Sequence, residues 1–472
     1  MNPIESLKLF LPETFLLGGA FLALLLDLFV KNKKAVGILS LLTLFGAACL
    51  MHRPESPLSL FHGFFTLDPL THFFRLLAVG VVALSILISM GYAPLQGKNE
   101  GEFYSLFLFM AFGLVLMAGA TNLLMIFMSI EFVSILSYLF TGFLKKNSAG
   151  KEASMKYFLF GSFSSGLMLY GMSLLFGISG SLELSVIQKA LLTFSSPAFT
   201  LTTLFLFIAG LGFKISMAPF HLWAPDAYQA APTPVTGFLT VGPKALGFAL
   251  LMRVLLTAFS SASAKWQPAL IGLSILTMTL GNFIAISQVN IKRLLAYSSI
   301  AQAGYILMGL AVANETGLNG VVIYLAAYAF TNLGAFAAIV AASNTLGSDD
   351  IQAYAGLSKK SPFLAAVLTV FLLSLAGIPP LAGFIGKFYV FSSAIQAGFI
   401  GFAVVAALNS AVAAFYYFKI VRVMYLVEPE ENSKPIRNSF STVLALCILL
   451  AGTFLLGLFP SPIITLVKNI FI

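Results

Sequence analysis

Apolar stretches long enough to cross a bilayer follow one another from Leu9 to Pro460, separated by short polar breaks. A membrane-spanning helix needs about 20 mostly apolar residues. Because 59% of the 472 residues are hydrophobic and only 9% are charged, no soluble core could hold this chain. Runs such as 21–30 and 364–375 are apolar on every face, which excludes the alternating pattern of a membrane strand barrel. The sequence therefore predicts an all-α integral membrane protein.

The polar breaks predict about fourteen transmembrane helices. The predicted spans are approximately 9–30, 35–51, 69–90, 103–120, 122–141, 153–178, 197–217, 234–258, 266–286, 296–313, 317–344, 361–398 with an interruption, 401–426 and 439–459.

Basic residues are distributed unequally between the two sides of these spans. If the loops alternate sides, sixteen Lys and Arg fall on one side and five on the other. Since cytoplasmic loops carry an excess of Lys and Arg, we expect the sixteen in the cytoplasm and both termini outside, in the periplasm. This topology explains the net charge of +9 without nucleic acid, because no soluble domain presents a basic surface. The five are Lys8, Arg53, Lys189, Lys265 and Lys468, while Arg75, Lys214, Lys244, Arg253 and Lys387 fall inside spans.

Two proline-containing segments interrupt the helical pattern at comparable places. Residues 217–226 include Pro219, and residues 376–383 include Pro379 and Pro380. Proline removes a helical hydrogen bond, and broken backbone at membrane depth is tolerated only where protein or water buries it. Matched breaks in two halves of a chain indicate inverted repeats. Ordinary loops between spans remain the alternative, more so for the first break than for the second.

We therefore predict two inverted five-helix repeats, each with a broken helix. The predicted regions are three N-terminal helices at 1–102, the repeats at 103–260 and 261–427, and a C-terminal loop with the last helix at 428–472.

Glu131, Lys214, Lys244 and Lys387 are ionisable residues at membrane depth. Such residues are costly in lipid and usually mark a functional path. Lysine is the basic residue whose pKa falls readily on burial, so a desolvated ammonium can release its proton near neutral pH, which arginine cannot do. A series of lysines with one carboxylate is thus a chain of proton sites whose affinities depend on their neighbours. The pattern predicts proton transfer across the membrane.

Structural alternatives stay open for several of these residues. Glu131 could be a neutral acid bonded to a neighbouring helix, and Lys244 or Lys387 taken singly could extend toward the membrane surface. His221, in the first break, could relay protons or only hydrogen-bond the frayed backbone. Arg75 and Arg253 lie near the outer ends of spans and are interpreted as interface anchors. They would then carry no protons.

No metal site and no bound cofactor are expected for this chain. Cys49 and Cys447 lie inside apolar runs without Cys-x-x-Cys spacing. The sequence lacks a glycine-rich phosphate loop, a dinucleotide fingerprint and histidines paired at haem-ligating spacing.

Four motifs resemble a known family. GFKISMAPFHLWAPDAYQAAPTPV at 212–235 is similar to the signature of the antiporter-like membrane subunits of respiratory complex I and of the related multi-subunit cation/proton antiporters. VGPKA at 241–245, NIKRLLAYSSIAQAG at 290–304 and GIPPLAGFIGKFY at 377–389 resemble the N-type subunits of complex I. The resemblance covers nearly the whole chain.

By motif match, the resemblance implies proton-translocating roles for four residues. It puts Glu131 on the fifth helix, Lys214 on the broken seventh, Lys244 on the eighth and Lys387 on the broken twelfth. The last two lysines favour the N type. The implied mechanism shifts Glu131 and Lys214 between coupled and separated states, after which the proton passes by way of Lys244 to Lys387 and leaves on the outer side.

The resemblance also implies a non-redox subunit of a translocase, NADH:quinone oxidoreductase, in a bacterial inner membrane. Implied partners are K-type and M-type membrane subunits, the peripheral redox arm and lipid, with NADH, FMN, iron–sulfur clusters and quinone bound by other subunits. The alternative is a subunit of a multi-subunit Na+/H+ antiporter, or of a related hydrogenase, ferredoxin-linked or deazaflavin-linked dehydrogenase complex.

Overall fold

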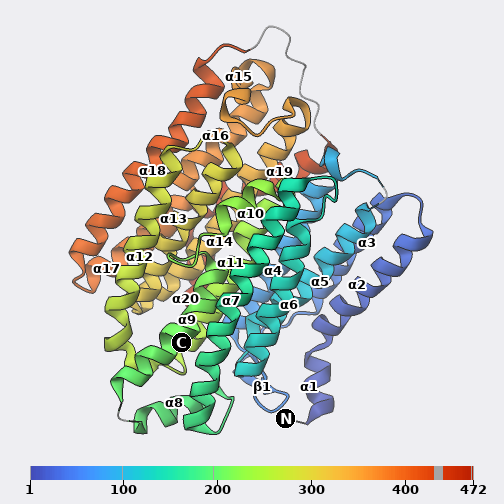
Figure 1. Cartoon of the computed structure of the whole chain (residues 1–472). Coiled ribbons are helices and arrows are strands. Elements are labelled where there is room, and N and C mark those ends of the chain that lie inside the picture. The colour runs from blue at the N-terminus through green and yellow to red at the C-terminus, as the bar shows by residue number, and fades with distance from the viewer. Residues whose placement is uncertain (1, 98, 195, 430–438, 469, 471–472) are drawn as a thin grey trace.

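The structure is a computed structural model that describes residues 2–97, 99–194, 196–429, 439–468 and 470. Within these ranges, thirteen helices are long and apolar enough to cross a membrane. Two shorter helices, α16 (Pro362–Ala376) and α17 (Ala382–Gln396), meet at a break and together make one more crossing (Figure 1). The chain is therefore an all-α, multi-pass membrane protein, and the expected fourteen transmembrane helices are confirmed.

The N-terminal region contains three membrane helices and a short hairpin. The hairpin pairs Leu58 with Leu67 in antiparallel register and was not predicted, because three-residue strands are too short to give a periodic signal. The elements are α1 (Pro3–Leu9), α2 (Leu11–Phe29), α3 (Lys33–Leu50), β1 (Leu58–Leu60), β2 (Phe65–Leu67), α4 (Pro69–Ser89) and the 3-10 helix η1 (Ala93–Leu95).

The first five-helix repeat is broken in its fourth crossing, between α9 and α10. A short helix, α8, lies outside the spans. The elements are α5 (Glu100–Gly119), α6 (Leu123–Thr141), α7 (Ser148–Ser179), α8 (Leu184–Thr193), α9 (Pro197–Ile215), α10 (Ala224–Ala230) and α11 (Thr233–Leu256).

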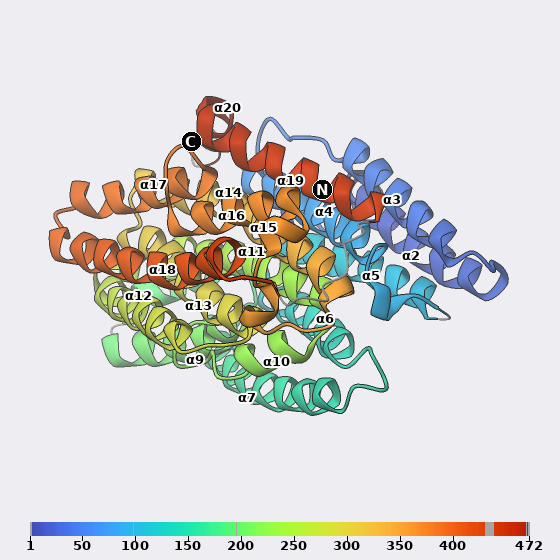
Figure 2. The same ribbon diagram turned by 90° about the horizontal axis from the view of Figure 1, so that it is seen from above.

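The second repeat has the same order of crossings and is broken between α16 and α17. The last membrane helix, α19, packs against α14 and α4 and so joins this repeat to the N-terminal region. In both views α2 and α3 lie at one end of the molecule and α17 and α18 at the other (Figures 1 and 2). The elements are η2 (Ser260–Ala262), α12 (Ser263–Ile286), α13 (Ile291–Val312), α14 (Glu315–Leu346), η3 (Ile351–Tyr354), α15 (Leu357–Lys360), α16, α17, α18 (Ile400–Leu426), α19 (Phe440–Leu458) and α20 (Ser461–Lys468).

Matching caps at Asn122 and Asn290 support the inverted repeats. Each asparagine caps the second helix of its repeat, with its side chain accepting from a backbone N–H of the first turn. Each also forms an isolated bridge with the segment after the third helix, Asn122 with Glu183 and Asn290 with Asp350. Successive crossings reverse direction, and α6 and α13 are the fifth and tenth crossings, so they begin on opposite sides. The two bridges therefore lie on opposite faces of the membrane domain.

Several helices extend beyond their predicted ends. α7 begins at Ser148 and not near 153, and α13 begins at Ile291 and not near 296. Polar first turns caused both errors, because Lys and Arg near a span were assigned to loops. Lys292 is consequently a buried helical residue and not a loop charge. Three of the sixteen basic residues that the sequence assigns to the cytoplasmic side lie outside the described residues: Lys98, Lys434 and Arg437.

Arg75 and Arg253 are not interface anchors. Arg75 is 1% exposed and its guanidinium lies 2.5 Å from the carboxylate of Glu13, which is also fully buried. Arg253 donates two hydrogen bonds to Asp68, at 2.8 and 3.1 Å. The sequence prediction was wrong because it treated each arginine alone, whereas both partners lie on distant segments. These ion pairs join α2 to α4 and α4 to α11.

Candidate functional site

Lys214 lies in the last turn of α9, where its side chain is 1% exposed. Its ammonium donates to the hydroxyl of Ser134 on α6, at 2.9 Å. Ser134 in turn donates to the carbonyl of Ile130, so its oxygen is oriented to accept from the lysine. A neutral hydroxyl therefore holds this buried cation.

Glu131 is one turn before Ser134 on α6 and is half-buried. Its carboxylate accepts a hydrogen bond from Ser165 on α7. Because Lys214 reaches Ser134, one turn from Glu131, the lysine and the glutamate lie close together, but they make no ion pair within 4.0 Å. Glu131 and Lys214 therefore belong to one site, but each hydrogen-bonds a different serine. They are near each other and not in direct contact.

The first break separates α9 from α10 at the level of Lys214. Ser216 ends α9 in the left-handed region, with φ 57°, and Ala218 donates its N–H to Thr277 of the second repeat at 3.1 Å. Pro219 follows directly. His221 is 5% exposed, and its Nδ1 has no hydrogen-bond partner among the described residues. The break is therefore buried in protein, as such backbone must be.

Lys244 lies in the middle of α11 and is 2% exposed. Its ammonium donates to the hydroxyl of Ser299 at 2.8 Å and to the carbonyl of the same residue at 3.1 Å. The ring of Tyr228 lies 5.5 Å away, within cation–π range. Lys244 is fully enclosed and does not extend to the membrane surface, so the snorkelling alternative is wrong.

Lys387 lies in α17 directly after the second break, which holds Pro379 and Pro380, and is 4% exposed. Its ammonium donates to the carbonyl of Ala376 and to the hydroxyl of Ser410, both at 2.8 Å. Gly377, at φ 90°, permits this arrangement, because a Cβ there would lie 2.7 Å from the lysine side chain. Lys387 therefore binds the end of the half-helix before the break.

Neutral polar residues fill the space between Lys244 and Lys387. Gln302 donates to the carbonyl of Leu375 at 3.0 Å and to the hydroxyl of Tyr417 at 3.2 Å, and it accepts from Tyr324 at 2.5 Å. Tyr417 also shares a hydrogen bond with Ser298. Sequence reasoning missed these residues, although Gln302 lies in a quoted motif, because one neutral polar residue in a span is unremarkable.

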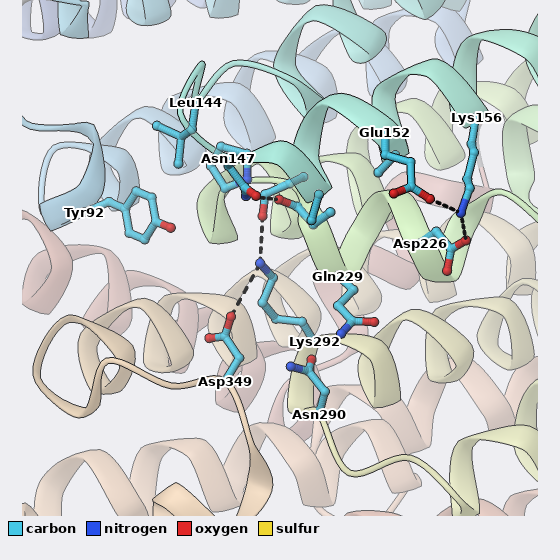
Figure 3. A pocket seen from close by; sticks show the side chains of 15 residues that line it. Tyr92, Leu144, Asn147, Glu152, Lys156, Asp226, Gln229, Asn290, Lys292 and Asp349 are labelled. Atoms are coloured by element: carbon cyan, nitrogen blue, oxygen red, sulfur yellow. Dashed lines mark hydrogen bonds and ion pairs between the residues drawn. The ribbon is translucent and has the colours of Figure 1, made fainter.

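A cavity of about 490 Å³ opens near the ends of α7, α10 and α13 (Figure 3). Lys292 lines it, and its ammonium donates to the carbonyl of Ala231 at 2.7 Å and lies 3.7 Å from Asp349. Asp226 of α10 pairs with Arg293 at 2.7 Å and with Lys156 at 3.3 Å. These contacts attach α10 to one helix of each repeat.

A row of hydroxyls leads from this cavity toward Lys244. Thr233, Thr236 and Thr240 lie on the same face of α11 as Lys244, at helical spacing, and all three are buried. Thr233 is adjacent to Pro232 of the cavity wall. Asn332 donates to Thr240 at 2.7 Å. The face that carries Lys244 is therefore polar along its whole length up to the cavity.

Among the described residues, no group of three or more His, Cys, Asp or Glu is placed to hold a metal ion. Cys49 and Cys447 are free and exposed. The four ionisable residues predicted at membrane depth, Glu131, Lys214, Lys244 and Lys387, are buried or half-buried, and each side chain hydrogen-bonds a serine.

Comparison with known proteins agrees with this arrangement. The family model described as NADH:quinone oxidoreductase/Mrp antiporter, transmembrane, matches residues 120–413. The NADH-quinone oxidoreductase subunit N of Trichlorobacter lovleyi is 42% identical over 465 residues, which are 97% of this chain and 96% of that protein. The NAD(P)H-quinone oxidoreductase subunit 2 of Gloeobacter violaceus is 41% identical, over 96% of this chain and 90% of that protein.

A solved structure has the same fold over nearly the whole chain. One chain of respiratory complex I from Thermus thermophilus is 32% identical, with a TM-score of 0.82, covering 96% of this chain and 98% of that one. The matched residues of the family model include both helix breaks and all four ionisable residues. The chain belongs to the family of membrane subunits shared by NADH:quinone oxidoreductases and Mrp antiporters.

Proposed function

We propose that this chain is a proton-translocating membrane subunit of a NADH:quinone oxidoreductase, and that it moves protons along Glu131, Lys214, Lys244 and Lys387. The chain itself performs no redox step. Quinone reduction by other subunits supplies the free energy. NADH, FMN, iron–sulfur clusters and quinone are bound elsewhere in the complex.

One observation carries the proposal: each of the three lysines on the proposed path is held by a serine hydroxyl. Lys214, Lys244 and Lys387 donate to Ser134, Ser299 and Ser410, at 2.8 to 2.9 Å. None has a carboxylate within 4.0 Å among the described residues, which is unusual, since buried charges are normally paired. A hydroxyl can donate to a neutral amine as well as accept from an ammonium. Each lysine therefore keeps a partner in both protonation states.

Glu131 and Lys214 form the proposed switch. Glu131 is bonded to Ser165 and Lys214 to Ser134, so the two charges interact without contact. When the carboxylate approaches, it stabilises the ammonium of Lys214. When it withdraws, the proton passes on toward Lys244. His221, in the break between Lys214 and Lys244, is available as a relay. The proton leaves by way of Lys387 on the side that carries both termini.

The cavity lined by Lys292 is a proposed site of proton uptake that joins the path at Lys244. It is open to solvent on the lysine-rich face, which the basic-residue asymmetry assigns to the cytoplasm. From it, Thr233, Thr236 and Thr240 lead to Lys244 along α11. We propose that water molecules bound between these hydroxyls pass protons inward without burying another charge.

The position of Glu131 also indicates a contact between α6 and another membrane subunit. It lies on the stripe of α6 that exposes Leu124, Met128, Ile135 and Leu139. A carboxylate on a lipid-facing surface is costly. We therefore propose that a neighbouring membrane subunit, of the K or M type, covers this stripe in a bacterial inner membrane.

Replacing Lys214 by methionine tests the proposal, because methionine keeps the length of the side chain and removes the proton site. In the assembled complex, in sealed vesicles, we expect Lys214→Met to abolish or strongly reduce proton translocation linked to quinone reduction. Lys189→Met, on α8 outside the spans, is the matched control and should pump normally.

Normal pumping by a fully assembled Lys214→Met complex would refute the assignment. A sodium-dependent proton flux in vesicles that lack any electron donor would instead favour an antiporter subunit.

A further inference from the structure

Thr277 joins the two repeats at the first helix break. It lies on α12, is fully buried, and its hydroxyl oxygen accepts a hydrogen bond from the backbone N–H of Ala218 at 3.1 Å. The same hydroxyl donates its proton to the carbonyl of Leu273 at 2.6 Å, which leaves its oxygen free to accept from the break. Ala218 lies four residues after Lys214. The backbone that follows Lys214 is therefore attached to a helix of the other repeat.

The N–H of Ala218 is where the chain first leaves α9. The two N–H groups before it bond back to that helix, Ser216 to Phe213 at 3.1 Å and Met217 to Gly212 at 2.7 Å. The next residue, Pro219, has no N–H to donate. A buried backbone N–H without a partner is rare, because leaving it unpaired is costly. Thr277 thus supplies the acceptor that the break requires at this point.

The helix that carries Thr277 packs against α13 with almost no space between the two backbones. A Cβ added at Gly281 of α12 would lie 2.6 Å from the backbone nitrogen of Ala301. A Cβ added at Gly304 of α13 would lie 2.5 Å from the backbone nitrogen of Met278. The hydroxyl of Ser274 also donates to the carbonyl of Gly304 at 2.7 Å. Since close-packed interiors transmit displacements, we expect α12 and α13 to move as one unit.

This unit contacts two successive lysines of the proposed path. Through Thr277, α12 holds the break that follows Lys214. Through Ser299, whose hydroxyl lies 2.8 Å from the ammonium of Lys244, α13 holds the next lysine. The separation between the end of α9 and Lys244 is therefore set by one pair of helices that belongs to the second repeat.

We propose that Thr277 is a positioning residue for proton transfer, which holds the first break, and with it Lys214, in register with Lys244. The inference rests on the proposed proton-translocating function. Thr277 itself takes up no proton. A displacement of α12 and α13 relative to the first repeat passes through the hydrogen bond to Ala218 and reaches the last turn of α9. The two repeats are thereby coupled at the point where the path crosses from one to the other.

The first test compares two replacements of Thr277 in the assembled complex, in sealed vesicles. Thr277→Val removes the acceptor and nearly preserves the shape of the side chain, whereas Thr277→Ser keeps the hydroxyl. We expect Thr277→Val to lower the protons translocated per quinone reduced at least about fivefold, which is the factor that one lost hydrogen bond corresponds to. Thr277→Ser should pump as the wild type does. Normal pumping by an assembled Thr277→Val complex would overturn the inference.

The matched control is Thr453→Val, on α19. Thr453 is also fully buried, and its hydroxyl donates to the carbonyl of Leu449 at 2.9 Å, as that of Thr277 donates to Leu273. Among the described residues it accepts no hydrogen bond from another helix. We expect Thr453→Val to pump normally. Equal losses in Thr453→Val and Thr277→Val would show that a buried threonine hydroxyl matters only within its own helix, and would refute the inference.

The second test measures amide hydrogen exchange at Ala218 in the intact complex, which reports on the break without relying on pumping. We expect the exchange at Ala218 to be faster in Thr277→Val than in the wild type, in Thr277→Ser and in Thr453→Val. An unchanged rate in Thr277→Val would show that Thr277 does not hold the break.

The outcomes separate this inference from the function on which it rests. If Lys214→Met stops pumping while Thr277→Val pumps normally, the proposed function stands and the positioning role of Thr277 is refuted. If Lys214→Met itself pumps normally, the proposed function fails, and the role of Thr277 in proton transfer fails with it.

Discussion

The ammonium of Lys214 lies 2.9 Å from the hydroxyl of Ser134, on the same helix as Glu131 and one turn beyond it. The lysine is thus held near the carboxylate without touching it, so a small movement of either group changes their interaction. In a poorly polarisable interior, the energy of two charges depends steeply on their separation. The hydrogen bond to Ser134 fixes the position of the Lys214 ammonium relative to the carboxylate of Glu131.

Replacing Ser134 by alanine should therefore impair proton transfer with little effect on assembly. A hydrogen bond to a charged group contributes about 1.5–3 kcal/mol, so we expect quinone-linked proton translocation to fall at least about tenfold. Ser129→Ala is the control, since Ser129 is a buried serine of α6 that bonds only a backbone carbonyl. Equal pumping by both variants would show that Ser134 does not position Lys214.

Arginine at position 244 or 387 should block the path although it keeps the positive charge. Arginine stays protonated in proteins, so it cannot pass a proton on. We expect Lys244→Arg and Lys387→Arg to lose nearly all proton translocation. The measurement is pumping per quinone reduced, together with a check of subunit assembly. Normal pumping by either arginine variant would mean that the lysine acts only as a fixed charge.

The open cavity predicts an effect of replacing Lys292 by methionine. Lys292 is buried, and its ammonium donates to the carbonyl of Ala231, the C-cap residue of α10. The Lys292→Met change therefore removes a positive charge from the proposed uptake site and leaves the end of α10 without this hydrogen bond. We expect a loss of proton translocation of at least about tenfold, the factor expected for one hydrogen bond to a charged group. Lys359→Met, an exposed lysine on α15 paired with Glu428, should have no effect. Equal proton translocation by Lys292→Met and Lys359→Met would contradict the proposed role of Lys292.

The ion pair of Arg253 with Asp68 should matter for stability and not for pumping. Both side chains are largely buried, and removing one partner of a buried pair costs about 3–5 kcal/mol. We expect Arg253→Gln to lower the midpoint of thermal unfolding of the complex, with the pumped protons per quinone unchanged in vesicles that remain assembled. A reduced ratio of protons to quinone would instead give Arg253 a part in the path.

The same pair predicts acid sensitivity. Burial alone would raise the pKa of Asp68, but the charge of Arg253 and hydrogen bonds from Arg253 and Thr71 hold that pKa below its usual value. A carboxyl with a lowered pKa contributes stability that is present above the unfolded-state pKa, about 3.9, and is lost as the pH falls through the folded-state value. We expect this contribution to be constant between pH 5 and 8, to decline as the pH falls below about 4, and to be lost only once the pH is below the folded-state pKa. Asp68→Asn should lack this component of the acid transition.

Long apolar spans made the number of crossings and the two breaks predictable from the sequence. A run of about twenty consecutive apolar residues forms a membrane-spanning helix, and prolines at comparable places in two halves of the chain indicate a repeat. Short elements such as β1 and α8 were not predicted, because segments of three to ten residues are too short to give a clear periodic signal. Helix starts with Lys or Arg in the first turn, as in α13, were placed too late for a different reason. There the charge lies inside protein, and the sequence alone does not show that.

The ionisable residues of the candidate site were predictable because a charge inside an apolar run is conspicuous. Their partners were not. Ser134, Ser299 and Ser410 are neutral residues of common type, and only the fold brings them to the lysines from other helices. Lys292 was missed because it stands next to Arg293 at a helix start, which suggests a solvated pair. The error about Arg75 has the same origin, since Glu13 lies on a separate helix.

The hydrogen bond from Lys387 to Ala376 links protonation to the state of a helix end. Ala376 is the last residue of α16, and the carbonyl end of a helix carries a partial negative charge that a cation stabilises. Lys214 occupies the last turn of α9, ahead of the other break. A proton that leaves either lysine therefore removes a positive charge from the C-terminus of a half-helix. On the proposed path, the helix end at each break therefore gains a stabilising positive charge when a proton arrives and loses it when the proton departs.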